Sequence, residues 1–174
     1  MSFAIIFMTH SLVGSDNHMN TIITSLPRIK DVPSLTEGYF PRYFCEKLTE
    51  ALDGGARSFM LSFGQAMEED TVLQVYCRSQ VEVAIHRLKT NRAQGGSFVP
   101  AYFHLLFQFL KKSTEFYGFR SGNYVMGAKM HTLFSALAPQ VVVLYEHDSD
   151  IRMLEQALFN QIEQEHAASS STQR

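Results

Sequence analysis

Two polar clusters hold the residue types that metal-binding or acid–base chemistry would need. One cluster follows an apolar run in the last third of the chain and contains Glu146, His147 and Asp148. The other cluster, near residue 17, contains Asp16 and His18. Carboxylates and imidazoles bind divalent metals and exchange protons, so these side chains suit both kinds of chemistry. These five residues are therefore the candidate ligands of a metal-assisted hydrolase.

The cluster that begins at Glu146 also has a simpler structural interpretation. Asp148, or Ser149 beside it, can cap a helix that begins there by accepting a hydrogen bond from an unpaired backbone N–H. Asp150 would add favourable charge at the positive end of the helix dipole. The chain contains no HxH or HExxH pattern that would fix ligand geometry. We therefore prefer helix capping and keep the hydrolase as the alternative, which requires the two clusters to converge.

No other motif predicts catalysis or a cofactor. The sequence has no GxSxG nucleophile elbow and neither of the glycine-rich phosphate-binding patterns, GxxxxGK[ST] and GxGxxG. Cys45 and Cys77 form no CxxC pair, and neither lies in a setting that lowers a thiol pKa. We expect no cofactor and no catalytic residue, and we favour a protein that is not an enzyme.

The elements that must position these residues alternate in type along the chain. Runs rich in β-branched and aromatic residues predict strands at 3–9, 57–63, 71–79 and 140–146. Apolar residues at helical spacing predict helices at 41–52, 80–92, 100–116, 124–137 and 149–165. Pro139 is expected to end the fourth of these helices.

This order of elements predicts a mixed α/β (α+β) fold, with a sheet of about four strands packed against four to five helices. The first and last strands are the candidates for the centre of the sheet. If they are parallel neighbours, the polar clusters that follow them project from the same edge. Residues 1–166 would form this single domain, and the polar residues 167–174 predict a disordered tail.

Composition favours a protein that binds other proteins. Charged residues make up 18% of the chain, whereas hydrophobic residues make up 45% and include 14 Phe. With few charges to cover its surface, such a chain can bury apolar surface against a partner, although a Phe-rich core in a monomer explains the composition equally well. We predict a small adaptor, assembly factor, chaperone-like or inhibitor protein that binds a protein partner or forms a homo-oligomer. The candidate contact residues lie in and just after the most apolar predicted helix: Tyr102, Leu105, Phe109, Phe116, Tyr117 and Phe119.

Charge and hydropathy argue against two other classes of partner. The formal net charge is −2, so no overall positive field attracts nucleic acid. A local basic group of Arg87, Lys89 and Arg92 is more simply a solvated helix face. The longest apolar stretch, 98–110, is shorter than the roughly 20 residues of a membrane span. We expect neither nucleic acid nor membrane as a partner, and a cytoplasmic location because no export signal is visible.

Overall fold

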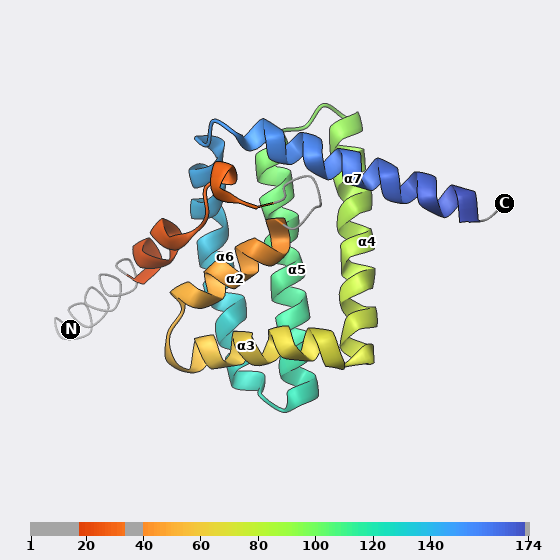
Figure 1. The fold of residues 1–174 in the computed structure, drawn as a ribbon. Helices are drawn as coiled ribbons and strands as arrows, with labels where there is room; N and C mark the ends of the chain where they lie inside the picture. Colours follow the sequence, from red (N-terminus) through yellow and green to blue (C-terminus); the bar gives the residue numbers. More distant parts are fainter. Residues whose placement is uncertain (1–17, 34–39, 173–174) are drawn as a thin grey trace.

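The computed structural model describes residues 18–33 and 40–172, and all regular structure in these ranges is helical (Figure 1). Helical residues 18–25 precede a short 3-10 helix, η1 (Ile29–Asp31). Six longer helices follow: α2 (Phe40–Ala51), α3 (Gly54–Glu69), α4 (Thr71–Ala93), α5 (Phe98–Ser121), α6 (Tyr124–Glu146) and α7 (Ile151–Thr172). No strand occurs in the described ranges, so the predicted α/β fold with its sheet is wrong. The first predicted strand, 3–9, lies outside the described residues.

The two strands predicted at 57–63 and 71–79 are helical instead. Residues 57–63 lie within α3, and residues 71–79 begin α4. The buried side chains of this part are spaced as on a helix rather than alternating: Phe59, Met60, Phe63, Leu73 and Cys77. Short apolar runs fit a strand or a buried helix almost equally well, and here burial at helical spacing decides the outcome.

A single residue, Asp70, joins α3 to α4 and stabilises the start of α4. Its carboxylate accepts hydrogen bonds from the backbone N–H groups of Val72 at 3.0 Å and Leu73 at 3.4 Å. The guanidinium of Arg120, at the end of α5, lies 2.7 Å from the same carboxylate and holds the pKa of Asp70 below its usual value. One side chain thus caps α4 and ties it to α5.

The predicted last strand, 140–146, is the C-terminal part of α6, which continues past Pro139. A proline lacks the N–H that would bond to the carbonyl of Ser135, but both residues are exposed, so water can satisfy that carbonyl. Val141 and Tyr145 beyond the proline are fully buried, with exposed fractions of 0% and 1%. Burial of this face outweighs the single lost hydrogen bond, and the helix does not end where the sequence predicted.

Helix α5 occupies the centre of the bundle. Figure 1 shows α5 between α6 and α4, with α2 and α3 crossing this layer and α7 lying across one end. The α5–α6 crossing is very close at Gly118 and Gly127. A Cβ on Gly118 would lie 3.3 Å from the Cα of Gly127 and 3.0 Å from the carbonyl oxygen of Asn123. The absence of side chains at these two positions lets the backbones approach.

The last helix, α7, is attached to the bundle only through its first half. Leu154, Phe159 and Ile162 are buried, whereas residues 163–170 are exposed. The helix runs to Thr172, beyond the predicted end at 165, and so includes part of the segment that was predicted to be a disordered tail.

Candidate functional site

Asp148, the central residue of one predicted metal cluster, is occupied by backbone hydrogen bonds. One carboxylate oxygen accepts from the N–H of Ile29 at 3.1 Å, and the other accepts from the N–H of Asp150 at 2.9 Å. The second bond shapes the turn that precedes α7, and the first ties η1 to that turn. These contacts give Asp148 a structural role that needs no metal.

The other predicted metal ligands do not form a metal site with it in the described part of the chain. Glu146 and His147 are exposed at the end of α6, and His18 is half-buried at the start of helical residues 18–25. Asp16 lies outside the described residues. Within 18–33 and 40–172, no group of three or more His, Cys, Asp or Glu side chains could hold a metal ion.

Two of the six predicted contact residues lie in the interior. Tyr102 and Leu105 are only 5% and 8% exposed. The ring of Tyr102 packs against Phe98 and Phe103, with centroid distances of 5.2 and 5.0 Å. Neither side chain is available to a partner in this structure, because helices cover α5 on several sides.

Three other predicted contact residues lie in aromatic contacts near the end of α5. Phe116 stacks on Tyr76 of α4 at 4.2 Å, and Tyr117 packs against Phe59 of α3 at 5.2 Å. Phe119 is 65% exposed. Phe116 and Tyr117 therefore hold helices together, whereas Phe119 packs edge-on against the exposed ring of Tyr124 at the start of α6, with 5.9 Å between the ring centroids.

The sixth predicted contact residue, Phe109, lines an apolar groove between α2, α3 and α5. The groove has a volume of about 780 Å³. Its apolar lining includes side chains from all three helices: Cys45, Met60, Phe63, Met67, Leu106 and Phe109. We call this hollow the α2–α3–α5 groove.

Charged contacts lie at the two ends of the groove. At one end, Arg42 in the first turn of α2 is 3.9 Å from Glu68 in the last turn of α3. At the other end, Arg57 near the start of α3 donates a 2.9 Å hydrogen bond to the carbonyl of Glu50, near the end of α2. The two walls therefore run antiparallel, with an apolar hollow between charged ends.

The local sequence explains the shape of the walls. Pro41 sits in the first turn of α2, where a missing N–H costs no helical hydrogen bond. Gly54, with a φ of 52°, adopts the left-handed conformation at the turn into α3. Met60 and Met67 are seven residues apart and so lie on one face of α3, which places both thioethers at the groove.

Cys45 contributes an apolar surface to the groove rather than a nucleophile. Burial raises the pKa of its thiol to about 12, and the nearby carboxylate of Glu46 adds to the effect. The thiol is therefore protonated at neutral pH, and a protonated thiol is a poor nucleophile. The groove thus suits binding better than covalent chemistry.

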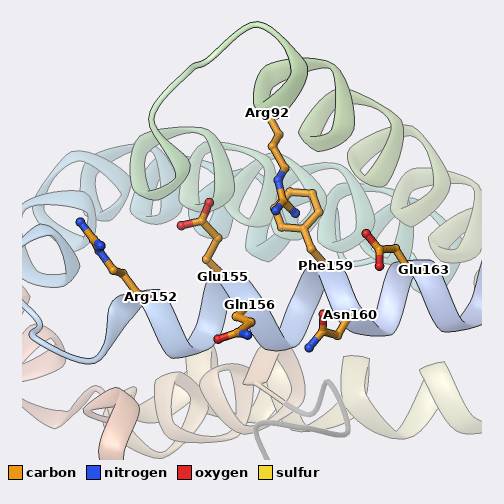
Figure 2. Close-up of a pocket in the computed structure, with 7 residues that line it drawn as sticks. All are labelled: Arg92, Arg152, Glu155, Gln156, Phe159, Asn160 and Glu163. Atoms are coloured by element: carbon orange, nitrogen blue, oxygen red, sulfur yellow. The ribbon is translucent and has the colours of Figure 1, made fainter.

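A second, polar pocket of about 480 Å³ lies between the end of α4 and α7. Figure 2 shows Arg92 reaching from α4 over the ring of Phe159, with Glu155 and Glu163 on either side along α7. The guanidinium carbon lies 4.1 Å from the ring centroid, which is a cation–π contact. Arg92, predicted as part of a basic face, thus attaches α7 to α4, and the open pocket around it is a helix–helix seam.

The sequence predicts one residue of the groove as a contact residue, but not the groove that surrounds it. The predicted contact residue is Phe109, but the sequence predicts a strand at 57–63, where the α3 wall of the groove lies. The spacing of Met60, Phe63 and Met67 fits one face of a helix and is the signal that could have revealed the α3 wall.

Comparison with known proteins yields no family model, no curated protein and no solved structure that matches this chain. Among the described helices, none combines the length and apolar character needed to cross a membrane. The groove is therefore the feature of this chain that indicates a function.

Proposed function

We propose that the chain is a non-enzymatic interaction module that binds an apolar helix of a protein partner in the α2–α3–α5 groove. The single observation that carries this proposal is the apolar hollow of about 780 Å³ between three helices. Hollows of about 300–1,000 Å³ with a mostly apolar lining are typical of binding sites in proteins. The low share of charged residues, 18%, agrees with a surface that is partly covered.

The dimensions of the groove suit a helix of about three turns. Its lining extends over 41–50 on α2 and 57–68 on α3. At 1.5 Å per residue these walls are about 13 and 16 Å long. An amphipathic helix that presents apolar residues at i, i+3 or i+4, and i+7 spans a similar length. The flexible side chains of Met60 and Met67 can adapt to the shape of such residues.

Site-specific photocrosslinking tests the proposal. A photoreactive amino acid replaces Leu61, which lines the groove and is 61% exposed, and the protein is irradiated in cells. The matched control carries the same amino acid in place of Val143, which is 54% exposed on α6 and does not line the groove. We expect an adduct with an apolar helical segment of another protein from position 61 only.

A second variant links the adduct to the groove lining. Phe109→Ala removes an apolar group from the floor, and loss of such an anchor weakens binding by about 10- to 100-fold. The yield of the adduct from position 61 should fall accordingly, with the helical circular-dichroism signal unchanged. Identical adducts from positions 61 and 143, or an adduct insensitive to Phe109→Ala, would refute the proposal.

A further inference from the structure

We infer that the helix bound in the α2–α3–α5 groove lies parallel to α2 and is basic at its N-terminal end and acidic at its C-terminal end. This inference rests on the proposed function, since it assumes that the groove binds a helix of a protein partner. It adds the direction of that helix and the charges that it carries. The charged side chains along the groove are unevenly distributed, and this asymmetry selects one direction.

The end of the groove at the start of α2 carries an excess of negative charge. The guanidinium of Arg42 lies 3.4 Å from the carboxylate of Glu46 and 3.9 Å from that of Glu68. Two carboxylates thus share one guanidinium, and all three side chains are exposed residues of the groove lining. We call this the acidic end of the groove.

The opposite end carries an excess of positive charge. The ammonium group of Lys47 lies 3.2 Å from the carboxylate of Glu50, so these two charges compensate each other. Arg57 donates its hydrogen bond to the backbone carbonyl of Glu50 and makes no ion pair with a carboxylate in the described part of the chain. Asp53 precedes α3 but does not line the groove. We call this the basic end of the groove.

These side chains set the polarity of the groove, because the dipoles of its two walls oppose each other. Helix α2 begins at the acidic end and α3 ends there. A bound helix carries about half a positive charge at its N-terminus and half a negative charge at its C-terminus. Its N-terminus is therefore favoured at the acidic end, which makes it parallel to α2. Lys or Arg in its first turn and Asp or Glu in its last turn complement the two ends further.

Two synthetic helical peptides test the charge order. Both contain about 12 residues, enough to span the walls, with the same leucines facing the groove and a hydrocarbon staple on the outer face that keeps them helical. The forward peptide has Lys in its first turn and Glu in its last turn, and the reverse peptide exchanges them. We expect the forward peptide to bind the full-length protein at least about threefold more tightly at low salt, since each exposed ion pair changes affinity by about 1.5- to 5-fold. Salt of about 0.5 M should reduce this preference by screening.

A charge-exchanged protein provides the matched comparison. In the variant Arg57→Glu/Glu68→Arg the acidic and basic ends change places, so it should prefer the reverse peptide. The control variant Arg78→Glu/Glu82→Arg exchanges two exposed charges on α4 that do not line the groove, and it should keep the preference for the forward peptide. Intrinsic differences between the peptides cancel in this comparison. An unchanged preference in the first variant would overturn the inference.

Photocrosslinking tests the direction of the bound helix. Leu61 lies one helical turn from Arg57 at the basic end, whereas Met67 is next to Glu68 at the acidic end. A photoreactive leucine at position 61 should form adducts with the C-terminal half of the forward peptide. A photoreactive methionine at position 67 should form adducts with its N-terminal half. The opposite assignment, read by peptide mass spectrometry, would overturn the inference.

The outcomes separate this inference from the proposed function. If Phe109→Ala weakens the binding of both peptides but the natural protein binds them equally at low salt, the inference fails and the proposed function stands. If neither peptide binds and position 61 captures no partner in cells, the proposed function fails as well. A partner helix captured in cells should be basic in its first turn and acidic in its last turn, and the opposite order would overturn the inference alone.

Discussion

Replacing Tyr145 by phenylalanine tests how the end of α6 holds the segment that precedes α2. The buried hydroxyl of Tyr145 donates a 2.6 Å hydrogen bond to the carbonyl of Pro27, and the ring stacks on Phe103 at 4.6 Å. Tyr145→Phe keeps the ring and removes only the hydrogen bond. Because the buried carbonyl then lacks this donor, we expect the free energy of unfolding to fall by about 1–2 kcal/mol. For a chain of this size, the Tm should fall by about 2–8 °C.

Tyr102 provides a matched control. Its hydroxyl is also buried but has no hydrogen-bond partner in the described part of the chain. Tyr102→Phe removes a polar group that is buried without compensation, so we expect stability to stay the same or to rise by up to about 1 kcal/mol. Burial raises the pKa of both phenols, so neither substitution changes the charge of the protein at neutral pH.

Urea unfolding followed by the helical circular-dichroism signal gives the comparison. The free energy of unfolding should fall with urea concentration at the same slope in all three proteins, so differences in the unfolding midpoint report differences in stability alone. The reasoning would be refuted if Tyr145→Phe lost no more stability than Tyr102→Phe, since the hydrogen bond to Pro27 would then contribute nothing measurable.

Three further predictions concern packing, electrostatics and thiol chemistry. In urea unfolding, Gly118→Ala should lower the free energy of unfolding by about 1–3 kcal/mol, because its methyl group would meet the backbone of α6. Gly64→Ala has nothing within 4 Å of the new methyl group, so it should raise the free energy of unfolding by up to about 1 kcal/mol through helix propensity. Asp70→Ala should lower stability at neutral pH. Arg120 lowers the folded-state pKa of Asp70, so the carboxylate contributes stability above the usual carboxyl pKa. That contribution is lost as the pH falls through the lowered folded-state pKa. The urea midpoints of Asp70→Ala and the natural sequence should therefore converge in acid. Burial raises the pKa of Cys45 to about 12, so mass spectrometry should detect slow alkylation of this thiol at neutral pH in the native protein and fast alkylation in urea.

Each of these predictions has an outcome that would contradict it. Equal changes in stability for the two alanine variants would mean that the α5–α6 crossing is not as close as described. Asp53 precedes α3 but makes no side-chain capping bond, so Asp53→Ala is the control for Asp70→Ala and should have the smaller effect. A difference between Asp70→Ala and the natural sequence that persists in acid would point away from the carboxylate. Rapid alkylation of native Cys45, which is partly exposed in the groove, would show that its pKa is not raised.

The helical parts of the chain were predictable where apolar residues recur every three or four positions. The helix expected at 41–52 corresponds to α2, Phe40–Ala51, and the helix expected at 100–116 lies within α5. The strand predictions at 57–63 and 71–79 failed because runs of aromatic and β-branched residues satisfy both patterns over so few residues. The sequence also suggested Phe109 as a contact residue, but not the walls that make a groove around it.

What the sequence determined by itself is local: the apolar character of α5, the turn at Gly54 and the uncharged segment 3–8. Tertiary structure alone decided that α6 continues past Pro139, that Asp148 bonds to the backbone of Ile29, and that α2, α3 and α5 enclose a groove. The physical reason is that a helix, a hydrogen bond or a hollow of this kind depends on contacts between residues far apart in the chain. Their burial outweighs the weak local preferences that sequence patterns report.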